Sequence, residues 1–240
     1  MARKTRARKR RVRKGGFRPF RFFGKLLLAV LLLTLAWVLV YRFVPVPATS
    51  IMIRDWTNGT GVTRDWVGFD QISPNLPRAV IGAEDAKFCA HWGFDFEAIE
   101  KAMETNEAGG QMRGASTISQ QTAKNSFLWP GRNMVRKGLE AYFTGLIEVV
   151  WGKRRIMEVY LNVAEFGVGV YGAEAASRHY FSKSAKDLTR TEAARLAAIL
   201  PDPITRSASS PGPYTTRYAG DIERRISIVD RDGQDSCLGI

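Results

Sequence analysis

The densest group of hydrogen-bonding side chains lies in residues 114–125, which read Gly-Ala-Ser-Thr-Ile-Ser-Gln-Gln-Thr-Ala-Lys-Asn. Buried polar side chains need hydrogen-bond partners, so a core helix would not carry this many. Ile118 and Ala123 interleave with them at helical spacing, which predicts a partly buried polar wall. Such a wall with one cation suits a large, oxygen-rich, anionic substrate. The alternative is an ordinary amphipathic helix with Ser116 or Thr117 as its N-cap.

Two glutamates have surroundings that would hold their carboxyl groups in opposite protonation states. Glu84 follows the apolar residues 79–83, so partial burial should raise its pKa toward neutrality and suit it to general base catalysis. Glu140 lies four residues after Arg136 and three after Lys137, and these cations should keep it charged. Two carboxyl groups whose surroundings shift their pKa values in opposite directions are typical of sites in which one group acts as an acid and the other as a base. The alternatives are a capping or salt-bridging role for Glu84 and a surface ion pair for Glu140.

Four motifs surround these residues in a fixed order. They are ED-x-x-F-x-x-H-x-G from Glu84, G-x-S-T-I-x-Q-Q-x-x-K-N from Gly114, R-K-x-x-E from Arg136 and K-x-x-I-x-E-x-Y-L-N from Lys153. In this order and spacing they resemble the peptidoglycan glycosyltransferases, the lysozyme-like polymerases of bacterial cell-wall synthesis. The resemblance extends over residues 51–203. No Ser-x-x-Lys occurs in the sequence, so the chain resembles the monofunctional biosynthetic members and lacks the transpeptidase signature of class A penicillin-binding proteins.

The resemblance implies a mostly α, lysozyme-like glycosyltransferase domain preceded by a single N-terminal transmembrane helix. It implies an enzyme that polymerises lipid II into β-1,4-linked glycan strands, with inversion at the anomeric carbon and release of undecaprenyl pyrophosphate. Glu84 would take the proton from the 4-hydroxyl of the acceptor sugar. Glu140 would assist at the donor side, directly or through a divalent ion such as Mg²⁺ or Mn²⁺, although no cofactor is required with certainty.

The resemblance also implies a set of substrate-binding residues. Lys124 and Arg132 would contact the donor diphosphate, because a point cation and a planar guanidinium can stabilise phosphate charge in a dry cleft. The other members would be Ser116, Thr117, Gln120, Gln121, Asn125, Arg136 and Lys137. Residues 105–114 and 126–134 are expected to be lid-like segments, and Phe127, Leu128 and Trp129 to reach toward the bilayer.

Two rival functions use the same features. A lytic transglycosylase or muramidase would share the fold and a catalytic glutamate, but it has no diphosphate to neutralise and therefore no use for Lys124 and Arg132. A non-catalytic, membrane-tethered cell-wall scaffold need not keep both carboxylates. The complete set of polar motif residues favours the polymerase.

The net charge of +13 belongs to the amino terminus. Residues 1–25 hold 12 of the 36 Lys and Arg and no acidic residue, which leaves 24 basic residues against 23 acidic ones elsewhere. The apolar residues that follow are long enough to span a bilayer as a helix. A cleavable signal peptide is the rival interpretation, and a nucleic-acid-binding arm is a weaker one.

Charge asymmetry predicts the topology. The basic tail should stay in the cytoplasm, so the domain should lie on the periplasmic side of the bacterial inner membrane. The expected partners are lipid II, the growing glycan strand and membrane lipids, with cell-division or other cell-wall synthesis proteins as candidates and no nucleic acid. The expected parts are a basic tail (1–25), a transmembrane helix (26–44), a linker compatible with a short hairpin (45–70), the glycosyltransferase domain (71–206) and a carboxyl-terminal loop, helix and tail (207–240).

Histidine and cysteine are scarce. With two histidines in the chain and no nucleophile pattern nearby, His91 is predicted to brace its motif by hydrogen bonding and not to bind metal. Cys89 lies in a motif and Cys237 in a polar tail expected to be disordered, so no structural disulfide is expected.

Apolar stripes at three- and four-residue spacing predict helices over residues 76–83, 139–150, 156–163 and 191–200, and a last helix over 214–229.

Overall fold

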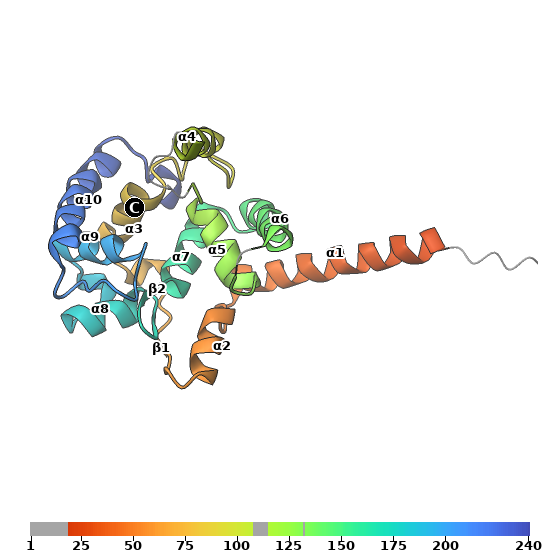
Figure 1. The fold of residues 1–240 in the computed structure, drawn as a ribbon, viewed down its shortest axis with the longest axis horizontal. Coiled ribbons are helices and arrows are strands. Elements are labelled where there is room, and N and C mark those ends of the chain that lie inside the picture. The colour runs from red at the N-terminus through yellow and green to blue at the C-terminus, as the bar shows by residue number, and fades with distance from the viewer. Residues whose placement is uncertain (1–18, 108–114, 132) are drawn as a thin grey trace, which may run out of the picture. The chain divides into compact units, whose positions relative to one another are not determined.

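The computed structural model describes residues 19–107, 115–131 and 133–240, and these residues are mostly helical, as the sequence predicts. The helices are α1 (Pro19–Phe43), α2 (Ser50–Thr57), α3 (Asn75–Glu84), α4 (Phe96–Glu107), α5 (Ile118–Phe127), α6 (Met134–Val150), α7 (Lys153–Val163), α8 (Ala173–Phe181), α9 (Arg190–Ile199) and α10 (Pro213–Arg231) (Figure 1). The strands are β1 (Thr63–Arg64), β2 (Glu165–Gly167) and β3 (Val170–Tyr171). Short 3-10 helices lie at η1 (Phe69–Gln71), η2 (Ala185–Asp187) and η3 (Ser236–Leu238).

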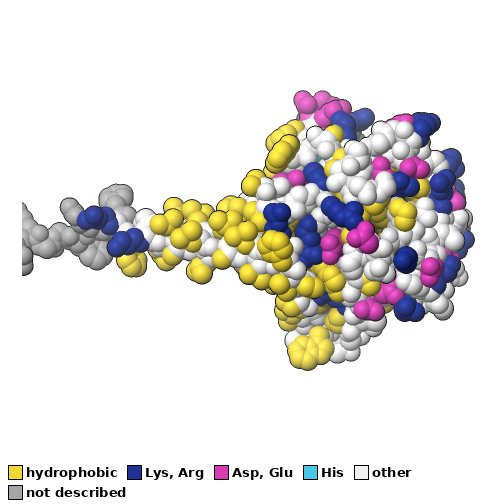
Figure 2. Space-filling view, turned by 180° about the vertical axis from the view of Figure 1, so that it is seen from behind, with side chains coloured by type: hydrophobic (Ala, Val, Ile, Leu, Met, Phe, Trp, Pro, Cys, Tyr) yellow, Lys and Arg dark blue, Asp and Glu magenta, His cyan; other side chains and the backbone are white. Residues whose placement is uncertain are grey.

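The chain divides into two units, Met1–Trp37 and Val38–Ile240. In the described part of the first unit, the side chains of α1 are mainly apolar and exposed, and Figure 2 draws them in yellow. The segment Arg21–Phe43 has 23 residues and a mean hydropathy of 2.4, so by length and composition it could cross a membrane. A signal sequence would meet the same criterion.

The core of the second unit confirms the predicted apolar stripes. Helices α9 and α10 pack against each other and against α3, while α5 packs against α6 and α7. Each helix turns its stripe inward, because residues three and four apart share a face. The fully buried members include Ala79 and Val80 of α3, Ile147 of α6, Ile156 and Val159 of α7, and Leu196 of α9.

The segment between α1 and the glycosyltransferase domain differs from the prediction. Residues 50–57 form helix α2 and no hairpin is present among the described residues of the linker. Thr49 caps α2 by accepting a hydrogen bond from the Met52 backbone N–H at 3.2 Å. Strand β1 pairs in parallel with β3, more than a hundred residues further along the chain. A hairpin needs a local partner strand, and here the partner is distant.

The carboxyl-terminal tail also differs from the prediction, because it is ordered and carries a disulfide. Cys237 is bonded to Cys89, with 5.5 Å between their Cα atoms. Leu238 is buried, and Asp235 pairs with Arg78 at 2.7 Å. The polar composition of this tail suggested disorder, but Asp230 and Asp235 both pair with the distant Arg78, and its one leucine is buried in the core.

Candidate active site

Glu84 is the last residue of α3, and the extended backbone of Asp85 ends the helix there. Its side chain is half-buried, and Gln121 Nε2 donates a hydrogen bond to Glu84 Oε2 at 2.9 Å. Burial raises the pKa of Glu84 and the Asp85 charge adds to this, while the Gln121 hydrogen bond and the charges of Lys124 and Arg206 oppose it. The direction of the shift is the one that the sequence predicts, and a raised pKa would suit a general base.

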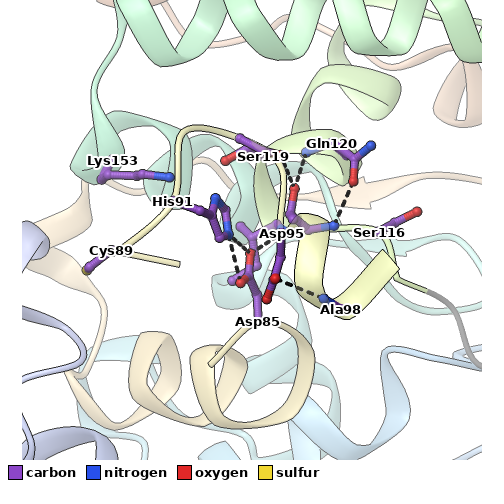
Figure 3. Close-up of polar contacts among 12 residues, drawn as sticks. Asp85, Cys89, His91, Asp95, Ala98, Ser116, Ser119, Gln120 and Lys153 are labelled. Atoms are coloured by element: carbon purple, nitrogen blue, oxygen red, sulfur yellow. Dashed lines mark hydrogen bonds and ion pairs between the residues drawn. The ribbon is translucent and has the colours of Figure 1, made fainter. Parts of the chain in front are cut away.

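The turn after Glu84 is tied to the start of α5 (Figure 3). Asp85 receives hydrogen bonds from His91 Nε2 at 2.9 Å and from the Ile118 backbone N–H at 3.0 Å. Thr117 Oγ donates to the Gly93 carbonyl oxygen at 2.7 Å. A carboxylate at a helix N-terminus satisfies a free N–H and interacts favourably with the helix dipole. These contacts confirm His91 as a brace and fix the position of α5 relative to Glu84.

Helix α5 separates its polar residues into two groups. Thr117 and Gln120 are buried and form a capping box, in which each backbone N–H donates to the other side chain at 3.1 Å. Gln121, Lys124 and Asn125 share another face, since they are three and four residues apart. Those three line a pocket that, together with its neighbour, is called the cleft below. Thr117 and Gln120 instead cap the start of the helix. Ser116 is exposed just before the cap.

Lys124 lines two pockets beside α5. It lines a pocket of about 280 Å³ with Ser50, Asn125, Trp129 and Arg136, and a second pocket of about 150 Å³ that also includes Gln121. Burial lowers the pKa of Lys124, the Glu140 charge opposes this, and the neighbouring cations Arg136 and Lys137 add to it. The Glu84 charge acts on it as well, so this half-buried cation lies within electrostatic reach of both glutamates.

Glu140 lies on α6 between two cations. Arg136 Nη1 is 3.1 Å from Glu140 Oε2, and Lys137 Nζ contacts the other carboxylate oxygen. Asn133 caps α6 by accepting a hydrogen bond from the Arg136 backbone N–H at 2.7 Å. Arg136 and Glu140 are both buried, which confirms the predicted cluster and shows that it is not a surface ion pair.

This geometry agrees with the comparison to known proteins. Residues 52–229 match the family described as Transglycosylase. The chain belongs to this family. It is 54% identical over 222 residues to the biosynthetic peptidoglycan transglycosylase of Caulobacter vibrioides, covering 91% of this chain and 97% of that protein. Proteins of the same name are 51% identical in Rhodospirillum centenum (92% of this chain, 96% of that protein) and 53% identical in Pseudomonas entomophila (81% and 85%).

The surroundings of Glu140 in this transglycosylase do not fit a divalent metal ion. Mg²⁺ and Mn²⁺ prefer several oxygen ligands, and among the described residues no cluster of three or more His, Cys, Asp and Glu could hold an ion. Each oxygen of Glu140 already contacts a cationic side chain. An ion bound there by protein groups alone would face two positive charges, so no step below is derived through a metal.

Some residues that the sequence assigned to the site or its edges lie in other surroundings than expected, and others lie outside the residues that the structure describes. Arg132 and residues 108–114 of the first lid-like segment lie outside the described residues. Residues 105–107 belong to α4, and Phe127 and Leu128 are buried, so they do not reach outward. Trp129 is exposed, as expected. Sequence analysis gave no role to Asp85, although it stands beside Glu84 in the first motif.

Proposed function

We propose that this transglycosylase is a peptidoglycan glycosyltransferase that polymerises lipid II and releases undecaprenyl pyrophosphate. The observation that carries the proposal is Lys124, a half-buried cation on one wall within electrostatic reach of two glutamates in different surroundings. The names of the close relatives and the four motifs support it. A polymerase needs a base for the acceptor hydroxyl and positive charge for a departing diphosphate, and the cleft offers both.

In the proposed reaction Glu84 acts on the acceptor. Its carboxylate removes the proton from the 4-hydroxyl of the acceptor sugar while that oxygen attacks the anomeric carbon of the donor from the opposite face. The new C–O bond forms as the bond to the diphosphate oxygen breaks, which inverts the anomeric centre. The proton remains on Glu84 until it passes to solvent. Its raised pKa makes Glu84 a stronger base than an exposed glutamate.

The cations act on the leaving group. Lys124 would stabilise the negative charge that develops on the donor diphosphate, and Arg136 lines the same pocket. Glu140 would position Arg136 and Lys137, since both contact its carboxylate. Arg132 is proposed from the family resemblance to assist Lys124. Ser116, Gln121 and Asn125 would bind sugar and phosphate oxygens, whereas Thr117 and Gln120 would contribute by starting α5.

The proposed topology places the domain on the periplasmic side of the bacterial inner membrane. The apolar amino-terminal helix is consistent with membrane anchoring, and the positive tail before it favours a cytoplasmic amino terminus. The Cys89–Cys237 disulfide supports this orientation, because disulfides persist in oxidising compartments such as the periplasm. A reporter enzyme fused after Ile240 should be active if it folds only outside the cytoplasm. Activity of a cytoplasm-only reporter would reverse the topology.

The decisive experiment compares synthesis with cleavage. Purified full-length protein is incubated in detergent with lipid II, and polymer is resolved by gel electrophoresis while free undecaprenyl pyrophosphate is measured. We expect both products. In parallel, sacculi free of lipid-linked precursors are incubated with the protein, and we expect no soluble fragments. Digestion of sacculi without polymer would establish the lytic alternative, and the absence of both activities would favour the scaffold.

A further inference from the structure

A third glutamate, Glu165, lies at the cleft and has no role in the mechanism above. It begins β2, directly after α7, and its side chain lines the 150 Å³ pocket together with Gln121 and Asn125. Gln121 links this pocket to the proposed base, because its Nε2 donates to Glu84 and its Oε1 accepts a hydrogen bond from Tyr160 Oη at 3.4 Å. Glu165 therefore lines the same pocket as the residue that donates a hydrogen bond to the proposed base.

One oxygen of Glu165 lacks a partner. Within the described part of the chain, Oε1 is buried and makes no hydrogen bond. Burial raises the pKa of Glu165, with a further contribution from the Asp55 carboxylate, while Arg54 and hydrogen bonds to the carboxyl group from the Gly169 backbone and the Tyr171 side chain oppose the shift. A buried acceptor without a partner is unfavourable and rare in folded proteins. Glu165 lines the pocket, so a donor that arrives with the substrate would satisfy this oxygen once the carboxyl group turns toward the pocket.

The lining of the pocket indicates which donor this is. Its polar members, among them Lys124 and Asn125, stand beside the apolar side chains of Val163, Leu200 and Pro203. A sugar hydroxyl would use only the polar part. An acetamido group has an N–H donor, a carbonyl acceptor and a methyl group, so it matches the carboxyl oxygen, the cationic and amide donors, and the apolar surface together.

We propose that Glu165 is a specificity-determining residue whose Oε1 accepts a hydrogen bond from the 2-acetamido N–H of an N-acetylated sugar in the lipid-linked substrate. This inference rests on the proposed glycosyltransferase function. Discrimination by a hydrogen bond of this kind is strong, because a substrate without the N–H leaves the buried oxygen unpaired. The pocket is small, so it accepts one substituent and its ring edge and not a whole disaccharide.

The test pairs enzyme variants with substrate analogues. Wild type, Glu165→Ala and Glu165→Gln are assayed with lipid II and with two 2-deoxy analogues, each lacking the acetamido group of one sugar. On lipid II, Glu165→Ala should raise KM by roughly 10- to 100-fold with little change in kcat, as expected for loss of a hydrogen bond to a charged or polarised group. Glu165→Gln keeps an acceptor oxygen and should recover most of the loss. With one of the two analogues, wild type and Glu165→Ala should become equal.

Controls separate the possible failures. Glu97→Ala removes an exposed carboxylate outside the cleft and should leave KM unchanged. Thermal unfolding of each variant identifies loss of folding. If Glu165→Ala is unstable, wild type still tests the inference, because one of the two analogues should raise its KM by roughly 10- to 100-fold relative to lipid II and equal KM values on all three substrates would contradict it. If wild type makes polymer but Glu165→Ala keeps its KM, or loses the same factor on lipid II and on both analogues, the inference is wrong. If wild type makes no polymer, the proposed function itself fails.

Discussion

The surroundings of Glu84 and of Glu140, called here the two ends of the candidate site, differ in how they withdraw a carboxyl group from bulk water, and both glutamates lie within electrostatic reach of Lys124. Glu84 is half-buried beside a neutral amide, with Gln121 as its hydrogen-bond donor. Glu140 is buried between Arg136 and Lys137, and each of its oxygens contacts a cation. What a buried carboxyl group touches therefore decides its chemistry more than burial does. Glu84 is suited to take a proton, whereas Glu140 is suited to hold cations in place.

The two ends are also held by different kinds of contact. The Glu140 end is built within α6, since Asn133, Arg136, Lys137 and Glu140 are all close in sequence. The Glu84 end depends on long-range contacts, namely the hydrogen bond from Ile118 to Asp85 and the disulfide from Cys89 to Cys237. Disturbance of the overall packing should affect the Glu84 end first.

The largest effect should come from removing the base. Glu84→Gln should lower kcat for lipid II polymerisation by a factor of about 10² to 10⁴, which is typical for loss of a positioned general base. The amide cannot accept the hydroxyl proton, but it preserves the shape of the side chain. A continuous assay with labelled lipid II measures the loss, with Glu100→Gln on the exposed face of α4 as the matched control.

Stability provides the second readout for this variant. A carboxyl group whose pKa is raised by folding destabilises the fold increasingly as pH rises through the window above its ordinary value of 4.5. Glu84→Gln should therefore be at least as stable as wild type at neutral pH. A variant that polymerises near the wild-type rate would contradict the assignment of the base, whatever its stability.

The next effect concerns the cation between the two ends. Lys124→Ala should reduce kcat/KM by roughly 30- to 1,000-fold, the range for loss of a charge-stabilising group in a shielded site. Lys186→Ala removes an exposed lysine outside the cleft and should have no effect. Polymer formation that survives Lys124→Ala at the wild-type rate would preserve the function and remove the diphosphate role of Lys124.

The same contrast explains what the sequence could predict. The Glu140 cluster follows from spacings of three and four residues in one helix, so the sequence alone predicts it. The same spacings predict the apolar stripes of α3, α6 and α7. The sequence offers Thr117 as a candidate N-cap, which the structure confirms, and the Thr-x-x-Gln pattern of a capping box could also have assigned Gln120 to this role. The pairing of Asp85 with Ile118, helix α2 and the disulfide depend on partners or packing fixed by the whole fold, and no local pattern specifies them.

A smaller and separable effect should follow from opening the disulfide. Replacing Cys89 and Cys237 by Ser should lower the free energy of unfolding by about 2–4 kcal/mol, because the link closes a long loop in the unfolded chain. Urea unfolding followed by tryptophan fluorescence measures this, and dithiothreitol should shift wild type but not the double variant. Equal unfolding midpoints for oxidised and reduced wild type would show that the ordered tail does not depend on the link.

The smallest effect tests the electrostatics of the Glu84 end directly. Glu84 acts as a base only when deprotonated, so kcat/KM should fall as pH falls through its raised pKa, and this acid limb should lie above 4.5. The hydrogen bond from Gln121 opposes the raised pKa, so Gln121→Leu should move the limb to higher pH. On that limb the rate should drop by roughly fivefold, the equivalent of one hydrogen bond of about 1 kcal/mol.

Gln121 also lines the cleft and can alter the maximal rate at high pH, so the midpoints of the acid limbs are compared and not the maximal rates. Lys137→Ala, at the Glu140 end, should leave the midpoint in place. A limb that stays fixed in Gln121→Leu would contradict the effect of this hydrogen bond on the pKa of Glu84, and a limb that moves equally in Lys137→Ala would show that the shift is not specific to the surroundings of Glu84.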